Sequence, residues 1–222
     1  MRILHSSDLH GRYKALLNGG HDFDLWLDTG DFMDNKGRKP NTAYTIDAGV
    51  ERVYQSKLIR WKSLTKRFTA WLAGRPAILV PGNHDFVSFG RRLQADGCPN
   101  VHIVSPEGVD VLGLRWAGFR EIPRMSDEWV GEIEQEGFED LVQQTWSCNP
   151  DVLATHAPAH GRLDRSSLGE NEGIVSLAQA LEHPGGIRAH FHGHTHFSGG
   201  EVLEQGGVRS VNGAKLVREW EL

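Results

Sequence analysis

Five short apolar runs, each followed at once by a loop rich in Asp, His and Gly, are the feature that most constrains the fold of this chain. The loops read "HSSDLHG", "DTGD", "PGNHD", "THAP" and "HGHTH", at residues 5–11, 28–31, 81–85, 155–158 and 192–196. Each apolar run is typical of a buried strand. Open α/β sheets place their ligand sites in the loops at the carboxyl ends of such strands. The pattern therefore predicts an α/β fold with a polar site at these strand ends.

The segments between these strands predict helices and further strands. Apolar residues at helical spacing indicate a helix over residues 43–73, with a basic opposite face that is expected to face solvent. Further helices are expected at about 127–147 and at 173–183. Strands at 101–104, 109–119 and 201–222 are expected to be antiparallel or mixed, with a hairpin turn at 205–207.

Length, charge and cysteine content narrow the class of protein. A chain of 222 residues is expected to form one domain spanning residues 1–222. Two cysteines without a CxxC pattern favour a reducing compartment, and the N-terminus resembles neither a signal peptide nor a membrane span. A cytoplasmic protein without a membrane partner is expected. The net charge of −5 disfavours a protein that coats duplex DNA, because such binding depends on Lys and Arg neutralising phosphates.

The polar residues at the strand ends form a set with metal-ligand chemistry. Carboxylate, amide and imidazole groups in this mixture suit Mn²⁺, Fe or Zn²⁺, and the lack of thiolates disfavours a structural zinc site. Two ions about 3.5–4 Å apart, bridged by a carboxylate, would use more of these ligands than one ion can. The candidate metal ligands are Asp8, His10, Asp31, Asn83, His156, His194 and His196.

These motifs resemble the signature of the calcineurin-like metallophosphoesterases. That signature is D-x-H, G-D, G-N-H-D/E, a lone His, and G-H-x-H. All five blocks occur here in order, as Asp8-Leu9-His10, Gly30-Asp31, Gly82-Asn83-His84-Asp85, His156 and Gly193-His194-Thr195-His196. The resemblance implies a four-layer α/β/β/α sandwich of two mixed sheets, with a dimetal site at the carboxyl ends of the strands.

The resemblance also implies a role for each residue. Asp8, His10, Asp31 and His196 would hold one metal ion; Asp31 would bridge to the second, which Asn83, His156 and His194 complete. His84 would stand outside the metals and protonate the leaving oxygen. Asp34 is either a catalytic residue that orients His84 or a loop residue that caps the next segment.

Several neighbouring residues are expected to be structural. Asp85 is expected either in a turn or in contact with the ligand candidates. His190 and His192 are expected in a strand, where they either pack in the core or contact the ligand candidates. His5 is expected in a strand and the tryptophans in the core. His160 is a candidate substrate contact, and Asn212 is a candidate for the lining of the pocket.

The expected activity is hydrolysis of small phosphodiesters, such as cyclic nucleotides, by attack of a metal-bridging hydroxide. The expected cofactors are two divalent transition metal ions, Mn²⁺ first, with Fe, Zn²⁺ or Ni²⁺ as alternatives. The preference for diesters rests on Asn35 and Pro81, which stand where phosphatase members carry phosphate-binding arginines. Alternative activities are a DNA nuclease of the SbcD type and a phosphomonoesterase, including a protein phosphatase. A scaffold that binds partners without catalysis is disfavoured, because no motif residue is missing.

Overall fold

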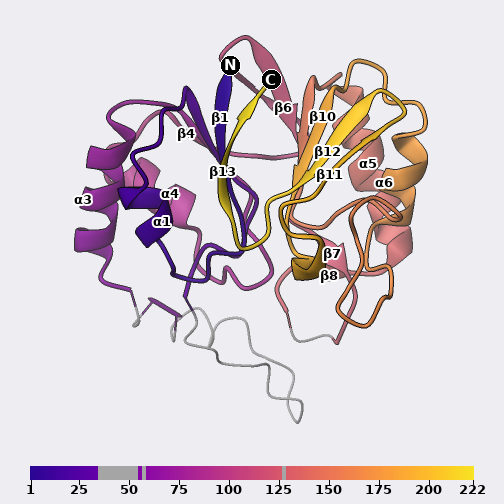
Figure 1. Cartoon of the computed structure of the whole chain (residues 1–222), viewed down its shortest axis with the longest axis horizontal. Coiled ribbons are helices and arrows are strands. Elements are labelled where there is room, and N and C mark those ends of the chain that lie inside the picture. Colours follow the sequence, from indigo (N-terminus) through magenta and orange to yellow (C-terminus); the bar gives the residue numbers. More distant parts are fainter. Residues whose placement is uncertain (35–54, 57–58, 127–128) are drawn as a thin grey trace.

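The computed structural model describes residues 1–34, 55–56, 59–126 and 129–222, and two large mixed sheets form its centre (Figure 1). The first sheet has the order β13-β1-β2-β3-β4. Strands β1 to β4 are mutually parallel, and β13 pairs antiparallel with β1. Their bounds are Arg2–Ser6 (β1), Leu25–Asp28 (β2), Ala77–Leu79 (β3), Val101–Ile103 (β4) and Val217–Glu221 (β13).

The second sheet has the order β11-β12-β10-β9-β6-β5. Strands β6, β9, β10 and β12 are parallel, and hairpins add β5 and β11 at the two edges. In the turn between β11 and β12, Gly206 and Gly207 both have positive φ, as the expected hairpin at 205–207 requires. The bounds are Val109–Val111 (β5), Leu114–Ala117 (β6), Val152–Ala154 (β9), Ala189–His192 (β10), Val202–Gln205 (β11) and Val208–Asn212 (β12). Ile122–Pro123 (β7) and Glu132–Ile133 (β8) form a small separate pair.

Helices cover the outer face of each sheet, and this confirms the four-layer sandwich (Figure 1). Because side chains alternate along a strand, Leu4 faces the helices while Ile3 faces the core between the sheets. On the second sheet, Leu153 faces the helices and Val152 the inter-sheet core. The first sheet is covered by α1 (Lys14–Asn18), α3 (Trp61–Leu72) and α4 (Phe89–Ala95), and the second by α5 (Phe138–Ser147) and α6 (Val175–Ala180). Two short 3₁₀ helices are η1 (Gln135–Gly137) and η2 (His196–Ser198).

The prediction of one helix over residues 43–73 is wrong within the described residues. Residues 35–54 and 57–58 lie outside them, and the backbone at Arg60 is not helical, so α3 begins at Trp61. Apolar spacing reports which side chains face the core and does not reveal a break in the backbone between two segments. The described basic residues Lys62, Lys66 and Arg67 are exposed, as expected of a solvated face.

The helix expected at 127–147 is wrong in its first half. Residues 127–128 lie outside the described residues; β8 and η1 then precede α5, which begins at Phe138. Gly131 has a φ of 83°, a left-handed conformation that no helix continues through. The helix expected at 173–183 is present as the shorter α6. Among the described residues, no helix combines the length and apolarity needed to cross a bilayer, and one domain over residues 1–222 stays a prediction.

Candidate metal centre

The predicted ligands lie at the carboxyl ends of strands from both sheets. Asp8 and His10 follow β1, Asp31 follows β2, and Asn83 follows β3 in the first sheet. In the second sheet His156 follows β9, and His194 and His196 follow β10. Parallel strands bring their carboxyl ends to one edge of a sheet, so sequence-distant side chains meet there.

Four of these ligands sit in a strained backbone conformation. The φ angles are 54° at Asp8, 44° at His10, 53° at Asp31 and 66° at His194, all in the left-handed region. Such a residue costs roughly 1–3 kcal/mol unless its surroundings fix it. Here the loops fix each other, because Asp8 N donates to Gly30 O at 2.8 Å and His10 N donates to Asp31 O at 2.9 Å. Strain concentrated at one cluster is typical of a functional site.

Gly11 lets the first loop leave the cluster. Its φ is 81°, and a side chain at this position would collide with Cβ of Asp34. A glycine at this position therefore lets the chain turn away directly after the Asp-x-His pair.

Asp8 is the centre of a first group of candidate ligands. Its Oδ1 lies 3.0 Å from Nε2 of His196, and its Oδ2 accepts hydrogen bonds from the Ser7 hydroxyl and the His194 backbone N–H. Burial opposes ionisation of this carboxyl, but the His196 hydrogen bond and the nearby charge of His156 outweigh it and lower the pKa to about 2. The Asp8 carboxylate is therefore ionised and ready to bind a cation.

Asp31 lies between two sets of imidazoles. Its Oδ1 is 3.6 Å from Nε2 of His156, and its Oδ2 is 3.9 Å from Nε2 of His10 and 3.8 Å from Nε2 of His84. Burial raises the pKa of this carboxyl, but the charges of His156 and His84 outweigh that effect and hold the pKa well below its ordinary value. A carboxylate whose two oxygens face different ligands has the geometry expected of a bridge.

Asn83, His156 and His194 form the second group. Oδ1 of Asn83 lies 2.9 Å from Nε2 of His156, and the His156 and His194 ring centroids are 5.0 Å apart. Nδ1 of His156 lies 2.7 Å from the Thr29 carbonyl oxygen, to which it donates when protonated. A metal-binding imidazole usually donates its second nitrogen in this way, which leaves Nε2 for the ion.

The donor set fits divalent metal ions. Within the described residues, three groups place one donor atom per residue within 4.8 Å of each other: Asp8, His10 and His196; His10, Asp31 and His84; Asp8, Asp31 and His156. Oxygen and imidazole donors suit Mn²⁺, Fe and Zn²⁺. The two cysteines lie elsewhere, Cys98 in the core beneath α3 and Cys148 at the end of α5.

His84 lies beside the candidate ligands, and the Trp129 ring packs against it. Its ring centroid is 3.9 Å from that of Trp129 and 4.9 Å from that of His10. Burial lowers the His84 pKa, and the charge of Asp31 counteracts part of that shift. Asp34 packs against Gly11, and its expected role in orienting His84 stays a prediction.

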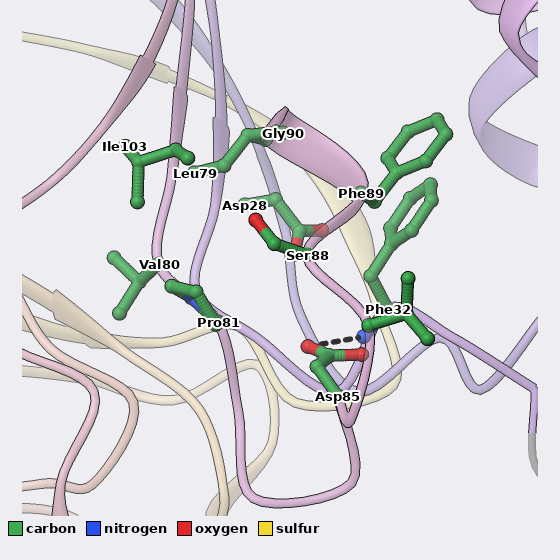
Figure 2. Close-up of a pocket in the computed structure, with 11 residues that line it drawn as sticks. Asp28, Phe32, Leu79, Val80, Pro81, Asp85, Ser88, Phe89, Gly90 and Ile103 are labelled. Atoms are coloured by element: carbon green, nitrogen blue, oxygen red, sulfur yellow. Dashed lines mark hydrogen bonds between the residues drawn. The ribbon is translucent and has the colours of Figure 1, made fainter. Parts of the chain in front are cut away.

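The loop that carries Asn83 and His84 is braced from behind by Asp85. This carboxylate accepts hydrogen bonds from the backbone N–H groups of Gly82, Met33 and Phe32, at 2.9, 2.8 and 3.3 Å. Figure 2 shows the bond to Phe32 beside a cavity of about 20 Å³, enough for about one water molecule. Asp85 is thus a turn residue, as expected, and joins the loops after β2 and β3.

Three further residues that support this loop were not foreseen from the sequence. Nη2 of Arg120 donates to the carbonyl oxygens of Gly82 and Asp85, at 2.8 and 3.4 Å. Gln55 donates from Nε2 to His84 O and accepts from Val87 N. The third is Trp129, whereas the other tryptophans lie in or against the hydrophobic cores. Only Arg120 carries a sequence signal, since "GFR" follows a strand as the metal motifs do.

The neighbouring residues have structural contacts. His190 and His192 are buried within β10, and Nε2 of the buried His5 lies 2.9 Å from the Thr29 hydroxyl. Asn212 donates to the Thr195 and Leu163 carbonyl oxygens, and so holds the loop between His194 and His196. His160 is exposed, and its expected substrate contact stays a prediction.

The chain is similar to a known protein family in sequence and to solved structures in fold. A family model described as calcineurin-like phosphoesterase matches residues 1–198. No curated protein sequence matches the chain. Among solved structures, the protein TT1561 of Thermus thermophilus is similar at 14% identity and a TM-score of 0.58, over 96% of this chain and 88% of that one.

Two further structures share the fold. A dimetal phosphatase from Danio rerio aligns at 10% identity and a TM-score of 0.52, over 96% of this chain and 86% of its own. A putative 5′-nucleotidase from Staphylococcus aureus aligns at 13% identity and a TM-score of 0.51, over 95% of this chain but 48% of its own. At these identities the likeness shows the fold alone.

Proposed function

Because the chain belongs to the calcineurin-like phosphoesterase family, we propose that it hydrolyses small phosphodiesters such as cyclic nucleotides with the help of two divalent metal ions. The ions would be held by the two groups around Asp8 and His156, with Asp31 between them. Bound there, divalent ions would stabilise negative charge on the phosphoryl oxygens and lower the pKa of a water molecule. Mn²⁺ is the metal we propose first.

His84 is the proposed proton donor to the leaving oxygen. It lies at the carboxyl end of β3 with the metal-ligand candidates, and its imidazole is partly exposed, so a substrate can reach it. Packing against Trp129 and the hydrogen bond from the His84 backbone N–H to Asp31 fix its position. A fixed imidazole is well suited to general acid catalysis near neutral pH.

The observation that carries the choice of diesters is the lack of a phosphate-binding arginine in the two motifs. Pro81 precedes the Gly82-Asn83-His84 loop, and Asn35, outside the described residues, has the other position. Two nearby arginines donate to backbone carbonyls: Arg12 to Leu9 and Asp8, and Arg120 to Gly82 and Asp85. A monoester carries about −1.5 to −2 charge near neutral pH. Bidentate arginine contacts favour that more highly charged group, and a site without them loses the advantage.

The test compares two esters with the same leaving group. With Mn²⁺ at matched pH, kcat/KM should be higher for bis(4-nitrophenyl) phosphate than for 4-nitrophenyl phosphate, and 2′,3′- or 3′,5′-cyclic nucleotides should be hydrolysed. Chelation should abolish turnover and Mn²⁺ should restore it. A clear preference for the monoester would refute the proposal in favour of a phosphomonoesterase.

A DNA nuclease is the second candidate. A groove of about 300 Å³ joins Gly11 and Asp34, beside the ligands, to the exposed Arg60 and Arg67. Cationic side chains along a groove that leaves the centre could hold the phosphates of a single strand. Cleavage of single-stranded DNA with Mn²⁺, reduced in an Arg60→Gln and Arg67→Gln double variant, would support this candidate over the small-diester function.

A further inference from the structure

Besides the groove lined by Arg60 and Arg67, the structure has a second hollow, of about 470 Å³, whose wall includes His194 and His196. It shares none of its lining residues with the arginine-lined groove. Its volume is in the range of small-molecule sites. Because two metal-ligand candidates form part of its wall, an ester whose phosphate is bound at the centre can extend a substituent directly into it.

Phe197 gives this hollow an aromatic surface. It follows the ligand candidate His196 within η2, and 67% of its surface is exposed. Single exposed apolar residues are common on proteins. This one differs because it lines a hollow whose wall also contains the ligand candidates. An exposed ring at that place can stack on a flat group of a substrate.

The rest of the lining is polar. The Lys215 backbone N–H donates to the Ser7 carbonyl oxygen, which ties this exposed lysine to the loop that carries Asp8. Glu172 is half-buried, and its pKa is raised by burial and by the charges of Glu170 and Asp164. Ser166 lies beside it in the wall. Hydroxyl, carboxyl and ammonium groups around one ring do not suit an acyl chain.

We propose that this hollow binds the nucleoside part of the ester substrate, with the base stacked on Phe197 and the sugar hydroxyls facing Glu172 and Ser166. The inference rests on the proposed function, since it assumes that a phosphate ester binds at the metal centre. A nucleoside offers both features that the wall complements: every base has a flat π-face, and the sugar has hydroxyl donors and acceptors.

The experiment compares two ligands that differ only in the base, adenosine 5′-monophosphate and ribose 5-phosphate. The affinity of Mn²⁺-loaded protein for each ligand is measured by competitive inhibition, with the 4-nitrophenyl ester that the wild type hydrolyses as the reporter substrate. If the wild type hydrolyses neither ester, calorimetry measures the two affinities. The wild type should bind the nucleotide more tightly. Phe197→Ala should weaken the nucleotide about tenfold, in line with the effect of removing one stacking partner. It should change the affinity for ribose 5-phosphate less than about twofold.

Two further variants and the metal content separate the outcomes. Phe197→Tyr should retain the preference, and Leu112→Ala, at an exposed position in the β5–β6 turn, is the matched control. Equal weakening of both ligands, or loss of bound Mn²⁺, would show that Phe197 supports His196 and would overturn the proposal. An unchanged nucleotide affinity would overturn it as well. If the wild type prefers monoesters, the proposed diester function is contradicted. The role of Phe197 is still decided separately, by the ratio of the affinities for adenosine 5′-monophosphate and ribose 5-phosphate.

Discussion

At the scale of single residues, the position of the His84 imidazole is compatible with two roles, metal ligand and proton donor. Its Nε2 is 3.8 Å from Asp31 Oδ2, close enough for a shared metal ion, and its partly exposed ring can also meet a leaving group. If it is the proton donor, His84→Ala should reduce turnover roughly 10²–10⁴-fold for esters with poor leaving groups. The loss should be smaller for a 4-nitrophenolate leaving group, which needs less protonation. Metal content should barely change.

Elemental analysis of purified His84→Ala, beside steady-state kinetics with both kinds of ester, checks this. His183→Ala, at an exposed position after α6, is a matched control and should retain both bound metal and turnover. Loss of both ions from His84→Ala would show that His84 is a ligand.

Substitution of the buried Asp31 should reduce metal binding more than substitution of the buried Asp8. Asp31 directs its oxygens to imidazoles on both sides, whereas Asp8 Oδ1 faces His196. Removing a bridging carboxylate leaves two cations repelling each other across a short gap. We therefore expect Asp31→Asn to reduce the bound metal to about one ion or fewer, and Asp8→Asn to retain more. Titration with Mn²⁺ followed by electron paramagnetic resonance counts the ions, and equal retention of two ions by both variants would contradict the bridge.

At the scale of elements, the loop after β3 depends on a side chain from the second sheet. Arg120, which follows β6, donates to Gly82 O and Asp85 O on either side of Asn83 and His84. A hydrogen bond from a charged donor contributes about 1.5–3 kcal/mol. Arg120→Met should therefore lower kcat/KM about tenfold or more and weaken the site that includes Asn83.

Arg124→Met is the matched control on the same segment. Its guanidinium forms an exposed ion pair with Glu134, and such pairs contribute about 0–1 kcal/mol. Steady-state kinetics and Mn²⁺ titration of both variants test whether Arg120 holds the loop. Equal, small effects would mean that Arg120 does not hold the loop.

The strand ends could be predicted from the sequence because each is a local signal. An apolar run followed by Asp, His or Asn fixes both the strand and its end, so Asp8, Asp31 and His156 meet as expected. Helix bounds could not be predicted, since the apolar spacing over residues 43–73 continues through Arg60, where the backbone is not helical. Near residue 130, pairing of β8 with β7 overrides the helical pattern.

The supports of the site could not be predicted for a different reason. Arg120 and Gln55 act on backbone carbonyls, and Trp129 acts through a ring contact with His84. Any polar or aromatic residue can make such contacts, so the residue type alone does not mark them; of the three, only Arg120 has a signal in the sequence, its position after a strand. Only the packing of the two sheets shows which residues reach the loop.

At the scale of the whole molecule, four histidines in or beside the central sheets have lowered pKa values. Burial lowers the pKa of His5 to about 3, of His192 to about 4 and of His194 to about 3, and it lowers that of His190 well below its ordinary value. The unfolded chain protonates these groups near pH 6.5. Between that pH and the folded pKa values the unfolded state binds more protons, so the free energy of unfolding falls as the pH falls. Buried carboxyls such as Asp28, whose pKa burial raises, act in the opposite direction.

A single variant isolates the histidine contribution. His190 lies in β10 with Nε2 2.7 Å from the Thr155 hydroxyl, and that hydroxyl also donates to Ala157 O, so His190→Leu leaves Thr155 with a partner. The variant removes one group that takes up a proton on unfolding. Above pH about 6.5 the difference in unfolding free energy between wild type and variant should be constant. Below it, the wild type should lose stability faster, by up to about 1.4 kcal/mol per pH unit.

Urea denaturation of chelator-treated proteins from pH 8 to pH 5 measures this difference in unfolding free energy, with His160→Gln at an exposed position as control. Parallel stability curves for wild type and His190→Leu would show that His190 does not contribute to the acid sensitivity.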